Sequence, residues 1–272
     1  MLLEHRFREP DLNLTLELFL RMLRDFFGEQ LVSVVLYGSI AFDDLAPGYG
    51  DLDFLAVVRD DLSDEVQERL VELRKPLRSG DFGVPAKMIE GAFLPRRMLD
   101  PAVRGKAFWW GTSGERRWET NVLGPFVLHV IRERGVVIWG QDIRGEIPPA
   151  SHEDLVREVQ TAFLGDRARG VGGTLHSVDW LLTTARMLLW SREGRLSSKS
   201  EAADWGYLNA RGAWRELLPK AKEIRLNPSM ADSPEVKCWL DGLTEPIQEA
   251  FDELEQELAQ RTPRHAGANP EK

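Results

Sequence analysis

The segment "LYGSIAFDDLAPGYGDLDFLAV", residues 36–57, constrains the fold of this chain more than any other part of its sequence. One apolar run, 31–38, ends in glycine; a serine and a loop of eleven residues follow, and a second apolar run, 51–58, begins with Asp51 and Asp53. Both runs have the length and composition of buried strands. Residues two apart in a strand point to the same face, so the two carboxylates are expected to project together, with their Cα atoms about 6–7 Å apart.

This arrangement suggests a chemical purpose for the two aspartates. Two carboxylates at this distance repel each other, and a cation between them removes the repulsion. Mg²⁺ suits the position because it takes oxygen ligands and often leaves coordination sites open for phosphate. Gly38 allows a sharp turn close to a ligand, where backbone N–H groups and the Ser39 hydroxyl can bind a phosphate. The segment therefore predicts a site for a metal-bound nucleoside triphosphate.

A third carboxylate, Glu90, lies inside the apolar segment "AKMIEGAFL", 86–94, which is expected to be a strand. A charged group in such a strand needs a partner or a function. Beside the strand 51–58, Glu90 could share the metals or accept the proton of an attacking hydroxyl group. Two metal ions about 3.5–4 Å apart could then assist an in-line displacement at phosphorus.

The chain changes character near "GEIPPAS", 145–151, where two prolines among small residues suggest a linker. We expect a mixed α/β domain over 1–150, a helical domain over 151–262 and a disordered tail over 263–272. A proline at position 246 is expected to kink or split the last helix. The expected helices are 11–27, 63–79, 125–134, 153–164, 177–192, 199–209, 212–224 and 234–260, and the expected strands are 31–38, 51–58, 86–94 and 135–140.

Composition narrows the class of protein. The hydrophobic share of 43% allows a sizeable core, and no apolar run is long enough to span a membrane. The single cysteine, Cys238, excludes an internal disulfide and a cysteine-based metal cluster, which suits the cytoplasm. The formal net charge of -9 disfavours a nucleic-acid partner and suits a cationic substrate, although many cytosolic proteins are acidic. The sequence leaves the oligomeric state open, with a monomer slightly favoured.

The order of Gly-Ser, loop, Asp-x-Asp and a later acidic strand residue resembles the nucleotidyltransferase superfamily. More closely, the chain resembles its aminoglycoside adenylyltransferases of the streptomycin/spectinomycin type. A second part of the resemblance is "LLTTARMLLWSREGRLSSKSEAADW", 181–205, and a third is "RERGVVIWGQDIRGEIPP", 132–149. The resemblance implies an α/β nucleotidyltransferase domain, a mixed sheet with flanking helices, followed by an all-helical domain that closes the cleft.

The resemblance also implies a reaction, in which a substrate hydroxyl attacks the α-phosphorus of ATP, AMP is transferred and pyrophosphate leaves. ATP would be the cosubstrate and two Mg²⁺ ions the cofactors. Asp51 and Asp53 match the metal ligands, and Glu90 matches the catalytic base and a further ligand. Gly38 and Ser39 match the triphosphate-binding turn. The implied acceptor is a small, cationic molecule such as an aminoglycoside, and the implied role is antibiotic resistance.

The helical part of the resemblance adds Lys199, which matches a lysine that contacts the nucleotide's phosphates. Independently, Ser198 and Glu201 have capping-box spacing, which places Lys199 in the first turn of a helix near free N–H groups. An ordinary solvated lysine is the alternative.

Candidates for contacts with the acceptor are Trp109, Trp110, His176 and Asp179. The stretch "GVGGTLHSVDW" departs from the family because His176 and two glycines, Gly172 and Gly173, replace the expected acids, so another acceptor is possible. The tryptophans are also suited to core packing, and His176 to the surface or a helix cap.

Two further interpretations stay open. Nucleotidyltransferases of this superfamily also modify proteins or RNA, as in toxin–antitoxin pairs. A non-catalytic nucleotide-binding protein on the same fold is the other alternative, since fold does not determine function.

Overall fold

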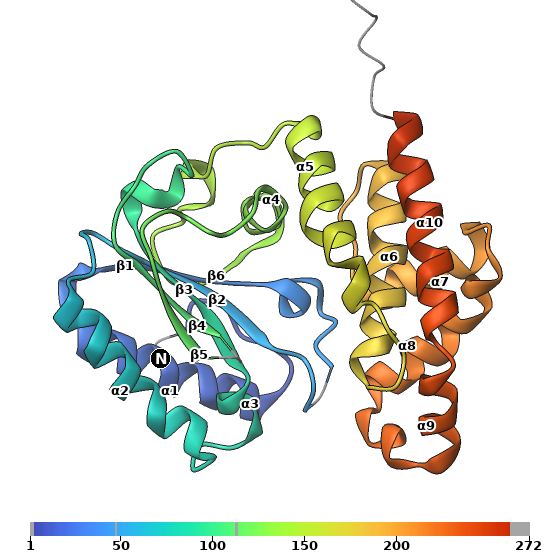
Figure 1. Ribbon diagram of the computed structural model, residues 1–272. Coiled ribbons are helices and arrows are strands. Elements are labelled where there is room, and N and C mark those ends of the chain that lie inside the picture. The colour runs from blue at the N-terminus through green and yellow to red at the C-terminus, as the bar shows by residue number, and fades with distance from the viewer. Residues whose placement is uncertain (1–2, 47, 112–113, 262–272) are drawn as a thin grey trace, which may run out of the picture. The chain divides into compact units, whose positions relative to one another are not determined.

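The computed structural model of the chain describes residues 3–46, 48–111 and 114–261 (Figure 1). Its residue contacts divide the chain into two compact units, Met1–Ala150 and Ser151–Lys272. The expected disordered tail, 263–272, lies outside the described residues.

The first unit is built on a six-stranded sheet with the order β5-β4-β3-β2-β1-β6. Strands β2 and β3 are parallel, and the other neighbouring strands are antiparallel, which confirms the expected mixed sheet. The strands are β1 (Leu31–Tyr37), β2 (Leu52–Val58), β3 (Ile89–Pro95), β4 (Ala107–Gly111), β5 (Gly114–Trp118) and β6 (Val136–Gly140).

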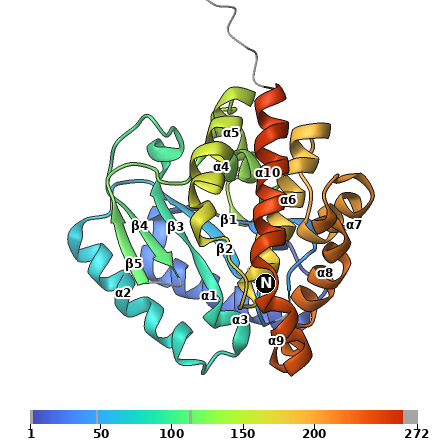
Figure 2. The same ribbon diagram turned by 45° about the vertical axis from the view of Figure 1, so that its right-hand side comes forward.

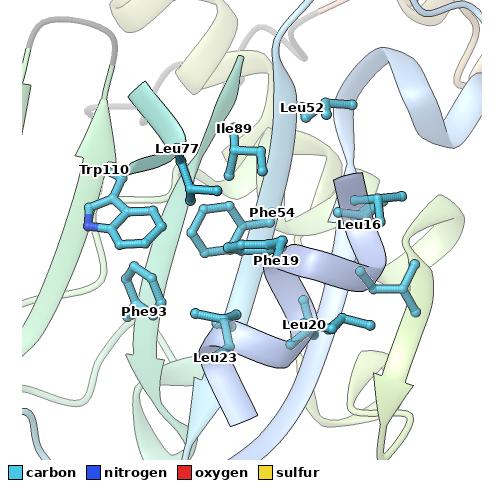
Figure 3. Packing of buried hydrophobic residues seen from close by; sticks show 14 of the residues in the cluster. Leu16, Phe19, Leu20, Leu23, Leu52, Phe54, Leu77, Ile89, Phe93 and Trp110 are labelled. Carbon is cyan, nitrogen blue, oxygen red and sulfur yellow. The ribbon is translucent and has the colours of Figure 1, made fainter. Parts of the chain in front are cut away.

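Helices cover both faces of this sheet because both sets of alternating side chains are apolar. On one face, Phe19 of α1 (Pro10–Phe27) and Leu77 of α2 (Asp64–Ser79) pack with Phe54 of β2 (Figure 3). On the other face, Leu55 of β2 packs with Ile131 of α4 (Pro125–Arg134). Figure 1 shows α4 on the side of the sheet opposite to α1 and α2.

Two features of the first unit differ from the sequence-based expectation. The expected strand 86–94 begins only at Ile89, since Val84–Lys87 forms the short helix α3 with a proline in its first turn. The hairpin of β4 and β5 had not been predicted; β5, "GERRW", lies at the edge of the sheet and lacks the apolar character of a buried strand. Pairing with β4 therefore determines its conformation.

The second unit is helical. Its helices are α5 (His152–Glu158), α6 (His176–Glu193), α7 (Lys199–Asn209), α8 (Leu218–Leu226), α9 (Pro234–Asp241) and α10 (Thr244–Arg261). The expected helix 234–260 is split as predicted, but the break lies at Gly242 and Leu243, and Pro246 lies in the first turn of α10. Proline is tolerated in a first turn because its missing N–H would have no intrahelical partner there.

Within the parts of the chain that the structure describes, no helix combines the length and the apolar character needed to cross a membrane.

Candidate active site

Three polar residues form one row across the centre of the sheet: Asp53 and Glu90, which were predicted as site residues, and Tyr37, which was not. Asp53 of β2 is paired with Tyr37 of β1 on one side and with Glu90 of β3 on the other. Directly paired residues of neighbouring strands point to the same face, with their Cβ atoms about 4.5–5.5 Å apart. Asp51 directly precedes β2, which begins one residue later than expected. The carboxylates predicted from distant parts of the sequence therefore lie at the same end of the parallel strands β2 and β3, which are neighbours in the sheet (Figure 2).

The surroundings of this row are partly apolar. Asp51, Asp53 and Glu90 are partly buried, whereas Tyr37 is buried in the cluster that contains Leu55 of β2. Burial raises the pKa of the Tyr37 hydroxyl well above its ordinary value, and the negative charges of Asp53 and Glu90 raise it further. The phenol is therefore neutral at physiological pH and lies within electrostatic range of both carboxylates.

The residue at position 38 must be glycine because the Asp53 carboxylate lies directly against its backbone. Its φ angle is +69°, a conformation that favours glycine, and a Cβ atom added to it would lie 2.0 Å from Oδ2 of Asp53. The Asp53 carboxylate therefore occupies the space that a side chain at position 38 would need. Gly38 and Ser39 also begin a short 3₁₀ helix, Gly38–Phe42, so their N–H groups lie at its N-terminus.

Replacing Gly38 by alanine is expected to lower the nucleotidyl transfer that the motifs imply about a hundredfold, since a displacement of about 1 Å at a reacting group has an effect of that size. The matched control is Gly28→Ala, because Gly28 has a φ of +54° but open space where its Cβ would be. Both variants incur backbone strain of about 1–3 kcal/mol, measurable by thermal unfolding. Equal losses of activity in the two variants would show that strain alone is responsible.

The carboxylates fit Mg²⁺ in their chemistry, since all three supply hard oxygen donors. Among residues 3–46, 48–111 and 114–261, however, no group of three or more His, Cys, Asp or Glu side chains is arranged to hold a metal ion. Mg²⁺ usually binds through one or two carboxylates, with water and substrate phosphates as the other ligands. Mg²⁺ at this row would therefore need water and phosphate oxygens among its ligands.

The two adjacent tryptophans of β4 have different environments because successive residues of a strand alternate between faces. Trp110 has no exposed surface and packs against Phe93 and Phe54, with ring centroids 4.7 and 5.8 Å away. It is a core residue, and we do not retain it as a candidate for substrate contact. Trp109 is partly buried, pairs with Ala92 on the Glu90 face and stacks on Trp118 at 5.3 Å.

In the helical unit, the structure brings together the three remaining candidates. Lys199 Nζ donates a hydrogen bond to Asp179 Oδ1 at 2.5 Å, and Nδ1 of the exposed His176 lies 3.9 Å from Oδ2 of Asp179. Lys199 is the first residue of α7, and the Ser198 hydroxyl accepts a hydrogen bond from the N–H of Glu201 at 2.9 Å. The expected cap is thus present, whereas the ion pair between α6 and α7 had not been predicted.

Sequence reasoning missed two cations near Lys199. Burial lowers the pKa of Lys199; the charge and hydrogen bond of Asp179 oppose this effect, and Arg186 and Arg225 add to it. Arg225 is almost completely buried. The sequence signal was weak, because an arginine in an amphipathic helix is most often a solvated residue.

The two glycines found in place of the expected acids have a packing role. A Cβ at Gly172 would lie 2.5 Å from the carbonyl oxygen of Leu240, and the N–H of Gly173 donates to the same oxygen at 2.8 Å. This loop packs closely against the end of α9, which leaves no room for a side chain at position 172.

Comparisons with known proteins concern the family and the fold of the chain. Residues 147–256 match the family model described as "Aminoglycoside adenylyltransferase, C-terminal domain". Spectinomycin 9-adenylyltransferases of two Staphylococcus aureus strains are 25% identical over 215 residues, which are 74% of this chain and 77% of each relative. The crystal structure of spectinomycin adenyltransferase AAD(9) from Enterococcus faecialis, with ATP and spectinomycin, matches with a TM-score of 0.70 and 18% identity. The match covers 89% of this chain and 99% of that one.

The mixed sheet with flanking helices and the helical unit that follows it have the fold of that adenyltransferase. The helical unit matches the C-terminal domain of aminoglycoside adenylyltransferases, and the chain is adenylyltransferase-like in sequence over 74% of its length, as the resemblance of its motifs implied.

Proposed function

We propose that this enzyme transfers AMP from ATP, with Mg²⁺, to a hydroxyl group of a small cationic aminoglycoside-type molecule, and that spectinomycin is the first acceptor to test. The observation that carries the proposal is the row in which Asp53 and Glu90 are direct neighbours on parallel strands beside Gly38. This arrangement supports the proposal because the reaction needs a metal ligand, a proton acceptor and a phosphate-binding turn close together, and Asp53, Glu90 and Gly38 are candidates for these roles.

In this proposal, Asp51 and Asp53 hold the Mg²⁺ ions, with Glu90 as a further ligand. The bound metal supplies charge neutralisation on the phosphates. Glu90 accepts the proton of the acceptor hydroxyl as its oxygen forms a bond to the α-phosphorus. The bond from that phosphorus to the bridging oxygen breaks, and pyrophosphate leaves with the electron pair. Placement of the two reactants provides much of the remaining rate enhancement.

For the nucleotide, we propose that Ser39 and the backbone of Gly38 bind phosphate oxygens and that Lys199 supplies a further positive charge. The hydrogen bond between Lys199 and Asp179 supports this role, because it holds the ammonium group in a defined position at the start of α7.

Replacing Lys199 by methionine is expected to lower kcat/KM for ATP about ten- to a hundredfold, since a hydrogen bond to a charged group contributes about 1.5–3 kcal/mol. Lys222→Met is the matched control, because Lys222 is also an ion-paired lysine of the helical unit, 2.6 Å from Asp204. Steady-state kinetics at varied ATP would reveal the difference. An unchanged KM and kcat in Lys199→Met would exclude Lys199 from nucleotide binding.

For the acceptor, Trp109, His176 and Asp179 remain the proposed contacts. The acidic net charge of -9 favours a cationic acceptor over nucleic acid. We also propose a cytoplasmic protein, in keeping with the lone Cys238. The oligomeric state stays open, with a monomer slightly favoured.

The direct test is an assay of pyrophosphate release from ATP and Mg²⁺ with spectinomycin, streptomycin, other aminoglycosides and a lincosamide as acceptors, with mass spectrometry of the products. The proposal expects an adenylylated product with at least one aminoglycoside-type acceptor. Radiolabelled ATP in a lysate is the complementary arm. A labelled protein or RNA, with no adenylylated small molecule, would instead support a macromolecular substrate.

A further inference from the structure

Tyr37 belongs to the row that it forms with Asp53 and Glu90, but no sequence motif had indicated it. It is the last residue of β1, immediately before Gly38, and its direct partner on β2 is Asp53. Because Asp53 is in turn paired with Glu90, the three side chains project from one face of three adjacent strands. The Tyr37 side chain therefore lies next to that of Asp53, with Glu90 one strand further along the row.

The ring of Tyr37 is held firmly. Only 6% of the residue is exposed, and it packs in the apolar cluster that α4 and the sheet share, with Leu55 and Ala92. A buried tyrosine hydroxyl normally finds a hydrogen-bond partner. On this face of the sheet, the polar neighbours of Tyr37 in its row are the two carboxylates.

Asp53 is confined from a second direction. The Cα atom of Gly38 lies against its carboxylate, as the 2.0 Å approach of a hypothetical Cβ shows. A carboxylate that holds a metal ion acts best when its own hydrogen bonds limit its orientation. The backbone at Gly38 limits the position of the Asp53 carboxylate, and a donated hydrogen bond would limit its rotation.

We propose that Tyr37 is a positioning residue, whose hydroxyl group donates a hydrogen bond to the Asp53–Glu90 carboxylate pair and orients it for the metal-bound nucleotide. The proposal rests on the proposed function of this site. Tyr37 itself touches neither the reacting phosphorus nor the acceptor, and it acts only through the carboxylates.

The test is Tyr37→Phe in the full chain, which removes the hydroxyl group and keeps the packing of the ring. We expect kcat to fall about tenfold, the KM for ATP to stay unchanged and the Mg²⁺ concentration for half-maximal activity to rise, because groups that orient metal ligands have effects of about ten- to a hundredfold. The thermal unfolding midpoint should stay near that of the wild type.

A second readout does not depend on turnover. Electron paramagnetic resonance of Mn²⁺ with α,β-methylene-ATP, an unreactive analogue, reports metal binding in the wild type and in Tyr37→Phe. We expect about tenfold weaker Mn²⁺ binding in the variant. In the background of Asp53→Asn, the same substitution should add nothing, since residues that act through one another are not additive.

Ser33→Ala is the matched control. Ser33 lies on the same strand and the same face as Tyr37, and its side chain is a fully buried hydroxyl without a hydrogen-bond partner among the described residues. Wild-type kcat and Mn²⁺ binding in Tyr37→Phe, or equal losses in Tyr37→Phe and Ser33→Ala, would overturn the proposal. If the wild type transfers no AMP to any acceptor, the proposed function fails, and the Mn²⁺ measurement still decides the role of Tyr37.

Discussion

Replacing Asp53 by asparagine is expected to reduce AMP transfer about a thousandfold while the protein stays folded. The substitution keeps the size of the side chain and removes its negative charge, so the packing against Gly38 is preserved. A metal ion that neutralises phosphate charge contributes several kcal/mol to transition-state stabilisation, and about 4 kcal/mol corresponds to a thousandfold in rate. The measurement is kcat for pyrophosphate release at saturating ATP, together with the thermal unfolding midpoint.

Asp60→Asn is the control for this experiment. Asp60 is an exposed carboxylate just beyond the other end of β2, so its replacement makes the same chemical change away from the row. Its activity should equal that of the wild type. Normal turnover in Asp53→Asn would exclude Asp53 as a metal ligand and remove the basis of the proposed mechanism.

Replacing Glu253 by glutamine is expected to destabilise the helical unit by about 3 kcal/mol, because removing one partner of a buried ion pair costs about 3–5 kcal/mol. The side chain of Glu253 is 9% exposed and accepts hydrogen bonds from Arg192 Nη2 at 2.9 Å and from Trp214 Nε1 at 3.0 Å. The N–H groups of Arg211 and Gly212 also donate to it, at 3.0 and 3.2 Å. Glu253 therefore connects α10 to α6 and to the segment before α8.

The pH dependence of this effect has a definite sign. Burial raises the pKa of Glu253, but the hydrogen bonds of its partners lower it more, so that its pKa in the folded protein is below the usual 4.5. A depressed carboxyl pKa contributes stability above the unfolded value, and this stability is lost as the pH falls through the folded value. The difference in unfolding free energy between the wild type and Glu253→Gln should therefore be full at pH 7 and decrease below pH 4.5.

Glu255→Gln is the control, since Glu255 lies on the same helix but is 66% exposed in its ion pair with Arg167 at 3.4 Å. Exposed pairs of this kind contribute about 0–1 kcal/mol. Denaturant unfolding at several pH values measures both variants. A loss in Glu253→Gln no larger than in Glu255→Gln would show that the buried network contributes little to stability.

Local patterns allowed much of the fold to be predicted. The start of the helix 199–209 was predicted correctly because Ser198 and Glu201 specify the cap within four residues of chain. Helix 125–134 and the strands β1 and β2 were placed to within a residue for a similar reason, as their apolar periodicity depends on neighbouring residues. The break at Gly242 was misplaced to Pro246, because a proline has the same local signature in a helix interior as in a first turn.

Most residues of the candidate site were named from the sequence, but their contacts were not. Asp51, Asp53, Gly38 and Ser39 belong to one short motif, and the spacing of its residues is informative by itself. Tyr37 was overlooked because an apolar strand that ends in tyrosine is common, and only the register against β2 shows that it lies beside Asp53. In sequence Trp109 and Trp110 were equal candidates for substrate contact. The position of β4 in the sheet shows that Trp110 is a core residue.

The sequence by itself determined the order of most helices and strands, though not α3 or the hairpin of β4 and β5, and it identified the Gly-Ser turn and the carboxylates as candidates, since each depends on residues close together in the chain. Only the tertiary structure decided that Glu90 stands beside Asp53, that Lys199 pairs with Asp179 and that Glu253 joins Arg192. These contacts join segments 20 to 61 residues apart. Their formation depends on strand register and helix packing. Both are set by the burial of apolar surface from many segments of the chain together, which no short stretch of sequence specifies.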